Sequence, residues 1–375
     1  MENPEWSERF RRKVQQRIFA VQRANGNIIS LHIPVDIRRF PWIKKLAADY
    51  AFQFSALAPF FTADPAVAAS WTAAIENAQR HPRQRAELSA LLVQQLSRRN
   101  APSAARDAAA RLVDPTSVAI VTGQQAGVFG GPLYTLYKGL TAAKLAMHVS
   151  EEHGVPAVAV FWVESEDHDW DEVASVSVLD ADLQRRTITL PRPHATEHSP
   201  IGAIQVGAEI AAAIEELGSL LPHTEFTAEL LADLHAAYSP GISMSEAFAR
   251  VLDRTLGELG VVVYECSDRS AKSLASGIFA HEVTHPGRTW SLAGEAGRRL
   301  TTGGYHAQVD AAPQTGAALF RIDGARTAVQ VGDPDLADDA RRRPETFSLM
   351  LVPGPWMWTS SRPSTQFASR LTVSD

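Results

Sequence analysis

The 375-residue sequence contains a single cysteine, Cys266. One cysteine excludes an internal disulfide framework and is typical of proteins from a reducing compartment. The chain also lacks an excess of basic residues, because its formal net charge is −6 and no long run of Lys or Arg occurs. We therefore expect no nucleic-acid partner, since proteins that bind nucleic acids concentrate positive charge on one face.

Long apolar runs are missing as well. The longest, from Val155 to Val163, has nine residues and includes Pro156. A helix that spans a bilayer needs about 20 apolar residues. The N-terminal stretch MENPEWSERFRRKVQQ is polar and charged, whereas a signal peptide has an apolar core. The sequence therefore predicts a cytoplasmic protein that has no membrane partner.

Three parts of the chain differ in composition. Helix-forming residues dominate positions 5–113, and β-branched runs begin to alternate with helical patterns after Asp114-Pro115. We expect a helical N-terminal region over 1–113, an α/β core over 114–348, and a tail of different composition over 349–375. The tail has Pro353, Gly354 and Pro355 in a row and is otherwise rich in Ser, Thr and Arg. Such a composition predicts disorder.

A strand, a loop, a helix and a strand follow one another at the start of the core. The segment Ser117–Val121 predicts a strand, Leu133 to about His153 a helix, and Val155–Val163 a buried parallel strand. This order is a βαβ unit, so the sequence predicts an α/β fold with a parallel sheet as its core. Further strands are expected at 173–179, 186–190, 261–264, 318–322 and 327–331, and further helices at 88–99, 207–221, 225–237 and 245–258.

The glycine-rich segment VTGQQAGVFGGPLYTLYK is the first candidate site. Its glycines permit close backbone approaches, and a loop that leads into a helix can present N–H groups to a phosphate or carboxylate. The spacing matches neither the dinucleotide fingerprint nor a Walker loop. A tight strand-to-helix turn without a ligand is the alternative interpretation. The candidate binding residues here are Gly123, Gln124, Gln125, Gly127, Tyr134 and Lys138.

The second candidate site is FWVESEDHDWDEV, where an apolar strand ends in a cluster of carboxylates around one histidine. Ligands of open α/β sheets bind outside the carboxyl ends of the strands, and both candidate sites follow strands. Carboxylates next to a histidine suit general acid/base catalysis or Mg²⁺ coordination. A solvated acidic turn that caps a helix is the alternative interpretation. The candidate catalytic residues are Glu166, Asp167, His168 and Asp169.

Three weaker signals complete the survey. Residues 281–285 (HEVTH) match the zinc-protease motif HExxH, but Pro286-Gly287 follows at once and the helix cannot continue, so we expect no metal site. The segment GGYHAQV adds Tyr305, His306 and Gln308 as candidate binding residues, with a surface loop as the alternative. Cys266 has no neighbouring histidine in the sequence, which favours a buried, inert thiol.

Three segments resemble, in their sequence and in their order along the chain, those of the bacillithiol-biosynthesis cysteine-adding enzymes. These segments are VTGQQAGVFGGPLYTLYKGLTAAKLA, VPAVAVFWVESEDHDWDEV and GYHAQV. The resemblance implies a Rossmann-like core with small insertions. It also implies an amide-forming ligase that joins cysteine to glucosaminyl-malate and yields the thiol bacillithiol. Trp162, in the second segment, is a further candidate binding residue. A nucleotide site is implied too, with an adenine nucleotide and Mg²⁺ as candidates.

The sequence departs from the family pattern after residue 348. Family members are longer and carry a C-terminal coiled coil that is used in self-association. We expect a chain that is truncated or frameshifted near residue 348 and therefore lacks the coiled coil and the homodimer that it forms. Two alternatives to the ligase are a remnant that binds ligand without turnover, and a nucleotidyltransferase or phosphohydrolase of the same fold, the latter by analogy alone.

Overall fold

The computed structural model describes residues 36–81, 84–194, 196–307, 309, 316–329 and 335–349. The chain forms two compact units, residues 1–44 and 45–375. In the described part of the first unit, the short 3₁₀ helix η1 (Ile37–Arg39) follows Asp36, whose side chain accepts the Arg38 N–H. All the candidate site residues belong to the second unit.

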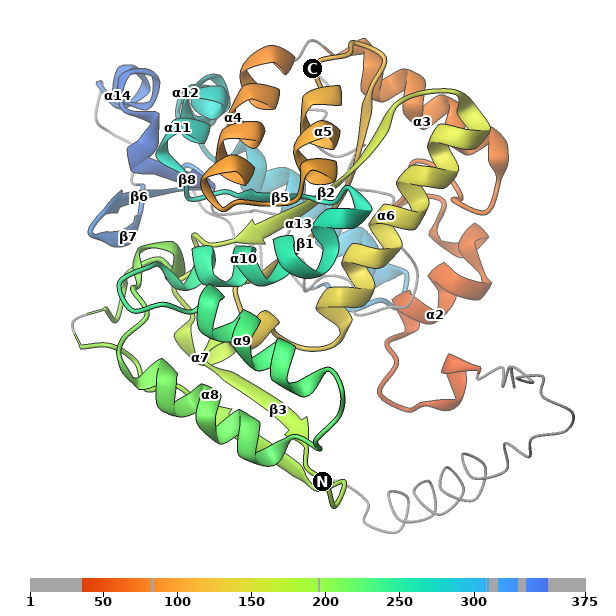
Figure 1. Cartoon of the computed structure of the whole chain (residues 1–375). Helices are drawn as coiled ribbons and strands as arrows, with labels where there is room; N and C mark the ends of the chain where they lie inside the picture. The colour runs from red at the N-terminus through yellow and green to blue at the C-terminus, as the bar shows by residue number, and fades with distance from the viewer. Residues whose placement is uncertain are drawn as a thin grey trace, which may run out of the picture. The chain divides into compact units, whose positions relative to one another are not determined.

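Three parallel strands form the core sheet of the second unit (Figure 1). They are β1 (Val118–Gln125), β2 (Ala157–Glu164) and β5 (Val262–Glu265), in the order β1-β2-β5. β1 and β2 pair along their whole length, and the last pair is Gln125 with Glu164. β5 pairs with β2 up to Val163. The three strands therefore end at one edge of the sheet, which confirms the predicted α/β fold with a parallel core.

Helices cover both faces of this sheet (Figure 1). Four of them are α4 (Arg85–Arg98), α5 (Ser103–Arg111), α6 (Tyr134–His153) and α10 (Met244–Leu256). Successive side chains of a strand point to opposite faces. In β2, Val158 and Val160 pack in a cluster with α4 and α5, whereas Phe161 and Val163 pack with α6 and α10. The strands are apolar on both sides because both faces of the sheet are buried. α6 connects β1 to β2, as the predicted βαβ unit requires.

The remaining elements precede the sheet or are inserted between its strands. Before β1 lie α2 (Lys45–Phe52), η2 (Phe54–Leu57) and α3 (Ala68–Arg80). After β2 come α7 (Trp170–Val173), the antiparallel pair β3 (Ser175–Leu179) and β4 (Arg185–Thr189), η4 (Ile201–Ala203), α8 (Glu209–Leu220) and α9 (Thr227–Ala237). The hairpin, α8 and α9 confirm the sequence prediction.

A second, antiparallel sheet follows β5. Its strands are β6 (Leu319–Asp323), β7 (Ala325–Ala328) and β8 (Phe347–Leu349), in the order β7-β6-β8. The helices of this region are η5 (Gly257–Leu259), α11 (Arg269–Lys272), η6 (Ser273–Ala275), α12 (Ser276–Thr284), α13 (Arg288–Thr302), α14 (Leu336–Arg342) and η7 (Pro344–Thr346). None of the helices in the described residues is long and apolar enough to pass through a bilayer.

Some predicted boundaries are wrong. β1 continues past Val121 to Gln125, because β2 offers backbone partners along the whole register. β7 begins at Ala325 instead of Thr327. Leu349, the first residue of the predicted tail, is the last residue of β8 and pairs with Leu319. Residues 350–375 of that tail lie outside the described residues, and the boundaries at 113 and 348 stay predictions.

A buried ion pair ties α4 to α10 and β5. The Arg99 Nε donates to Asp253 at 2.6 Å and the Arg99 Nη2 donates to the Val263 carbonyl at 2.7 Å. The two charged side chains are 0% and 4% exposed. Burial raises the pKa of Asp253, and the charge of Arg99 opposes this shift. Breaking such a pair is costly, because the remaining charge is left buried without a partner.

We expect Arg99→Ala to lower the free energy of unfolding by about 3–5 kcal/mol, as measured by urea denaturation. Arg254→Ala is the matched control. Arg254 follows Asp253 on α10, but its ion pairs with Glu229 and Asp233 lie at the surface. Exposed pairs contribute little, so the control should be far less destabilising. Equal losses in the two variants would contradict a special role for the buried pair.

Candidate functional site

The candidate site begins with the last three residues of β1, which are all buried. Because side chains alternate along a strand, Gln124 points to the face covered by α6 and Gln125 to the opposite face. Gly123 lies opposite Trp162 of β2. A Cβ atom at Gly123 would lie 2.6 Å from the Trp162 carbonyl oxygen. This close contact leaves room only for glycine.

The loop after β1 is closed by its own hydrogen bonds. The N–H groups of Gly127, Gly130 and Gly131 each donate to a carbonyl two or three residues earlier in the chain. Phe129, inside the loop, has a φ of 55°, which is uncommon for a residue with a side chain. The expectation that the loop presents free N–H groups to an anion is therefore wrong for these three groups.

The buried Tyr238, which follows α9, holds this loop in place. Its hydroxyl donates to the Gly127 carbonyl at 3.3 Å. Its ring packs edge-on against Phe129, with the ring centroids 5.4 Å apart. Burial raises the pKa of Tyr238, so the hydroxyl keeps its proton and remains a donor. The conformation of the loop thus depends on a contact with a distant helix.

Lys138 and Gln124 form the polar part of the site on the α6 side. The Lys138 Nζ donates to Gln124 Oε1 at 2.8 Å and to the Gly123 carbonyl at 3.4 Å. It also lies 5.0 Å from the centre of the Tyr134 ring, one helical turn earlier. Burial lowers the pKa of Lys138 to about 8. A cation that has lost part of its hydration is suited to bind an anionic group of a ligand.

The acidic loop, residues 164–172, is held through its backbone. The first two N–H groups of η4 donate to the carbonyls of Asp167 and Ser165, both at 2.7 Å. The Arg192 Nη2 donates to the His168 carbonyl at 3.2 Å. The insertion after β2 therefore fixes the directions in which the side chains of the acidic loop point.

Glu166 and Asp169 have partners that hold the acidic loop in place. Glu166 is buried, and its carboxylate accepts hydrogen bonds from Lys272 and, at 2.7 Å, from Ser348. Asp169 caps α7 and accepts the Glu172 N–H at 3.4 Å. The capping role is the one that the alternative interpretation of this segment assigned. The catalytic roles of Glu166 and Asp169 stay predictions, and their contacts favour positioning of the loop.

Asp167 and His168 are the other two candidate catalytic residues, and their side chains lie next to each other. The His168 side chain is 48% exposed, and its Nδ1 lies 3.4 Å from Asp167 Oδ1. The same oxygen accepts a hydrogen bond from Arg326 Nη1 at 3.3 Å. A carboxylate next to one ring nitrogen orients an imidazole. This arrangement suits a general base that faces solvent.

One hydrogen bond joins the two motifs. The Gln125 Nε2 donates to Glu172 Oε2 at 2.6 Å. Burial raises the pKa of Glu172, and the charges of Asp167 and Asp169 add to the shift. The end of β1 and the acidic loop after β2 therefore form a single polar site at the edge where the parallel strands end.

The sequence does not single out three other residues of this site. Lys272 belongs to α11 and Arg326 to β7, and neither is part of a recognisable motif. Glu164 belongs to the acidic run but carries no predicted role. Burial raises the pKa of Glu164 to about 7, and the charge of Glu166 adds to the shift. Long-range packing brings the two cations to the acidic loop, and no local pattern could have revealed them.

The third motif lies in a different part of the unit. Tyr305 is buried, and its hydroxyl donates to Asp49 of α2 at 2.9 Å. Its apolar cluster includes residues of α2 and η2 and is separate from the core around β1 and β2. His306 is exposed, and Gln308 lies outside the described residues. The binding roles of these residues stay predictions, and the contacts of Tyr305 are those of a packing residue.

Trp162 lies on the same face of the sheet as Gln125. Its ring meets Tyr264 of β5 edge-on, with the centroids 4.9 Å apart. The Trp162 Nε1 is buried and has no hydrogen-bond partner among the described residues. A buried donor without a partner is costly, and a ligand acceptor would remove that cost. The binding role of Trp162 stays a prediction, and its buried donor without a partner supports that prediction.

The HExxH segment has another role. α12 ends at Thr284, so His285 lies beyond the helix, and its ring stacks on that of His281 with the centroids 4.1 Å apart. The Glu282 carboxylate accepts hydrogen bonds from the Thr289 hydroxyl and the Ala318 N–H. In the described ranges, no group of three or more His, Cys, Asp and Glu side chains is arranged to hold a metal ion.

Cys266, directly after β5, is buried. Its Sγ lies 3.5 Å from Ser165 Oγ and 3.8 Å from Glu164 Oε1. Burial raises the pKa of the thiol, and the charges of Glu164 and Glu166 add to the shift. This confirms the predicted buried thiol, which stays protonated and is a poor nucleophile.

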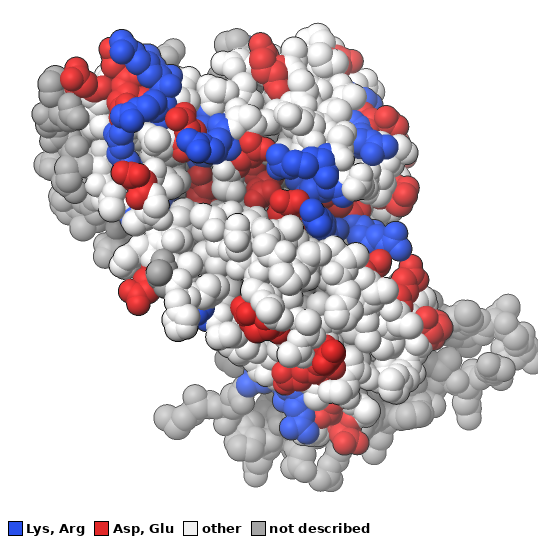
Figure 2. Space-filling view, turned by 60° about the vertical axis from the view of Figure 1, so that its left-hand side comes forward, with Lys and Arg blue, Asp and Glu red and all other residues white. Residues whose placement is uncertain are grey.

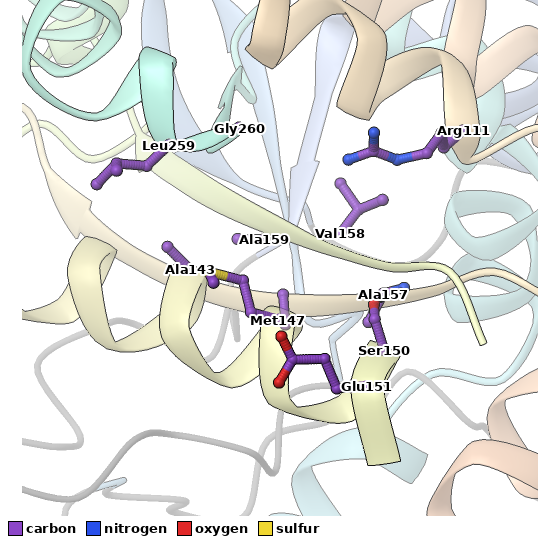
Figure 3. Close-up of a pocket in the computed structure, with 11 residues that line it drawn as sticks. Arg111, Ala143, Met147, Ser150, Glu151, Ala157, Val158, Ala159, Leu259 and Gly260 are labelled. Carbon is purple, nitrogen blue, oxygen red and sulfur yellow. Dashed lines mark hydrogen bonds between the residues drawn. The ribbon is translucent and has the colours of Figure 1, made fainter. Parts of the chain in front are cut away.

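A pocket of about 250 Å³ lies at the other end of β2 (Figure 3). It is lined by Arg111, Ala143, Ala146, Met147, Ser150, Glu151, Ala157, Val158, Ala159, Leu259 and Gly260. None of the candidate site residues lines it. On the face that Figure 2 shows, basic and acidic side chains are interleaved in a band, so this face carries no field of a single sign.

Comparison with known proteins relates the chain to one family. Residues 33–348 match the family model described as "Bacillithiol biosynthesis BshC, N-terminal Rossmann-like domain". A protein of Salinibacter ruber named "Putative cysteine ligase BshC" is 31% identical over 354 residues, which are 90% of this chain and 63% of that protein. A protein of Chlorobaculum tepidum with the same name is 38% identical over 231 residues, 60% of this chain and 40% of its own length. The chain thus spans only part of these relatives.

We expect Gly127→Ala to distort the loop after β1. A Cβ atom at Gly127 would lie 2.9 Å from the Gly131 Cα, which cannot move without the backbone. Overpacking of this kind costs about 1–3 kcal/mol of unfolding free energy, which urea denaturation can measure. Gly277→Ala in α12 is the control, because its Cβ would meet no atom within 4 Å. Stability losses of the same size in both variants would contradict the steric argument.

The low pKa of Lys138 can be measured by NMR titration of the ¹³C-methylated lysine side chains. We expect one resonance to titrate near pH 8, below the ordinary lysine value of 10.5, because burial disfavours the charged form. The Lys138→Arg variant assigns this resonance by its disappearance. A Lys138 resonance that titrates near the ordinary value would show that the ammonium is well solvated.

Proposed function

Because the chain belongs to the BshC family, whose N-terminal Rossmann-like domain it matches over residues 33–348, we propose that it is a cysteine ligase of bacillithiol biosynthesis. The reaction joins the carboxylate of cysteine to the amine of glucosaminyl-malate and forms an amide. The observation that carries this proposal is the Gln125–Glu172 hydrogen bond, which joins the two most specific motifs into one site. The names of the relatives from Salinibacter ruber and Chlorobaculum tepidum support it.

Lys138 and Gln124 bind an anionic group of the substrate. The ammonium is held beside Gln124 Oε1 and is partly shielded from water, which strengthens its attraction to an anion. The candidate residues Gly123, Gln125, Gly127, Tyr134 and Trp162 shape the same end of the sheet. This role would compensate for the cost of placing a lysine where burial disfavours its charge.

His168 takes up the proton that the substrate amine loses as the amide bond forms. Its exposed ring can reach a bound amine, and Asp167 beside Nδ1 orients the ring. Glu166 and Asp169 position the acidic loop through Lys272 and through the cap of α7. Of the four candidate catalytic residues, Asp167 and His168 are therefore the two that act on the substrate.

Amide formation is uphill in water, so the cysteine carboxylate must be activated. The loop after β1 does not fit a phosphate group through Gly127, Gly130 and Gly131, since their N–H groups are bonded within the loop. The adenine nucleotide and the Mg²⁺ that the resemblance implies therefore stay predictions. The cytoplasmic location also stays a prediction.

The proposal can be tested in a bacillithiol-producing bacterium whose own cysteine ligase gene is deleted. We expect expression of this chain to restore bacillithiol, as measured by mass spectrometry. His168→Ala should lower the thiol level by about 100-fold, the usual contribution of a general base, and Lys138→Ala should lower it as well. Lys144→Ala, on an exposed part of α6, is the control.

The outcomes separate two questions. Normal thiol levels in both the His168 and Lys138 variants, at equal amounts of protein, would contradict the assigned site. An unmodified chain that accumulates in the cell and restores no thiol would contradict the proposed activity of this chain.

A further inference from the structure

Three carboxyl groups at the start of the acidic loop lie close to two cations. Lys272 pairs with Glu166, and Arg326 pairs with Asp167 at 3.3 Å. Glu164, the last residue of β2, is the third carboxyl group. Within the part of the chain that the structure describes, Glu164 has no ion pair of its own. The cluster is therefore balanced in charge only if one of its carboxyl groups is neutral.

The surroundings of Glu164 indicate which carboxyl group that is. Glu164 is 6% exposed. Its Oε1 accepts the Glu166 N–H at 3.1 Å and lies 3.8 Å from Cys266 Sγ. Its Oε2 is buried and has no hydrogen-bond partner among the described residues. A carboxylate in this place would be a buried charge with few donors, whereas a neutral acid is buried at much lower cost.

The charged and titratable groups around Glu164 come from four elements. They are Glu166 and Asp167 on the acidic loop, Tyr264 and Cys266 on β5 and just after it, Lys272 on α11 and Arg326 on β7. Burial is the main cause that raises the pKa of Glu164, and Arg326 opposes the shift. Burial also keeps the Tyr264 and Cys266 side chains protonated, so neither adds a charge.

We propose that Glu164 is a positioning residue that works as a neutral carboxylic acid. With Glu164 neutral, each of the two cations has one carboxylate partner. An ionised Glu164 would attract Arg326 away from Asp167, and Asp167 would then no longer hold His168 in a fixed orientation. The effect on catalysis rests on the proposed function, whereas the protonation state of Glu164 does not.

The variant Glu164→Gln tests the protonation state, because glutamine is neutral at every pH and has nearly the same shape. A raised pKa means that the folded wild type binds this proton more tightly than the unfolded chain does. The wild type therefore loses stability as the pH rises from about 4.5 to about 7. The Tm of the variant, relative to the wild type, should rise by about 5 °C or more between pH 5 and pH 8.

Glu265→Gln is the matched control for this experiment. Glu265 is the last residue of the neighbouring strand β5, and its carboxylate accepts hydrogen bonds from the hydroxyls of Ser245 and Ser267. This variant shows how the loss of a buried carboxylate that has two hydroxyl donors affects the Tm. Parallel Tm profiles of Glu164→Gln and the wild type would overturn the proposal.

If Glu164→Gln does not fold, an infrared titration of the wild type tests the protonation state instead. The carbonyl band of a buried neutral carboxyl group at pH 6 supports the proposal, and its absence overturns it.

The positioning role is tested by the pH dependence of kcat/KM in a ligase assay. Glu164→Gln should keep more of its pH 7 activity at pH 9 than the wild type does, because no charge appears that competes for Arg326. Identical pH profiles would overturn the positioning role. A wild-type chain without ligase activity would instead contradict the proposed function, and the Tm profiles would still decide the protonation state of Glu164.

Discussion

The parallel pairing of β1 with β2 is the constraint on which the rest of the site depends. The two strands run in register over eight residues and end level, with Gln125 opposite Glu164. Because they are parallel and adjacent, whatever follows each strand must emerge at the same edge of the sheet. The glycine loop and the acidic loop therefore adjoin each other, although α6 separates them in the sequence. The alternation of side chains then places Gln124 towards Lys138 and Gln125 towards Glu172.

Burial at this edge acts on acids and bases in opposite directions. It lowers the pKa of Lys138 and raises the pKa of Glu164, and in both cases the charged form is the one disfavoured. Glu166, also buried, forms an ion pair with Lys272. Charged side chains at this edge are thus partly neutralised and held in fixed directions, whereas His168 and Asp169 are exposed to solvent.

The insertions between the core strands give the acidic loop its shape. η4 and Arg192, both from the insertion after β2, bind three of its carbonyl groups. Arg326 comes from the second sheet, 159 residues after Asp167 in the chain. These segments lie within residues 33–348, the range of the family model. The small insertions that the family resemblance implies therefore contribute residues that hold the candidate site in place.

The sequence by itself determined the βαβ order, the α/β class and the two segments that meet at the edge of the sheet. These features follow from local periodicity and glycine content, which neighbouring residues fix. It did not determine that Glu166 would be engaged by Lys272, or that three N–H groups of the glycine loop would bond within the loop, whereas a helix cap in the acidic segment was one of its two interpretations. Only the tertiary structure decided the first two points, because it alone places Lys272 and Arg326 next to the acidic loop. The pairing of Glu166 and Asp167 depends on cations that are more than a hundred residues away in the chain. No local sequence pattern indicates which of these side chains will come into contact.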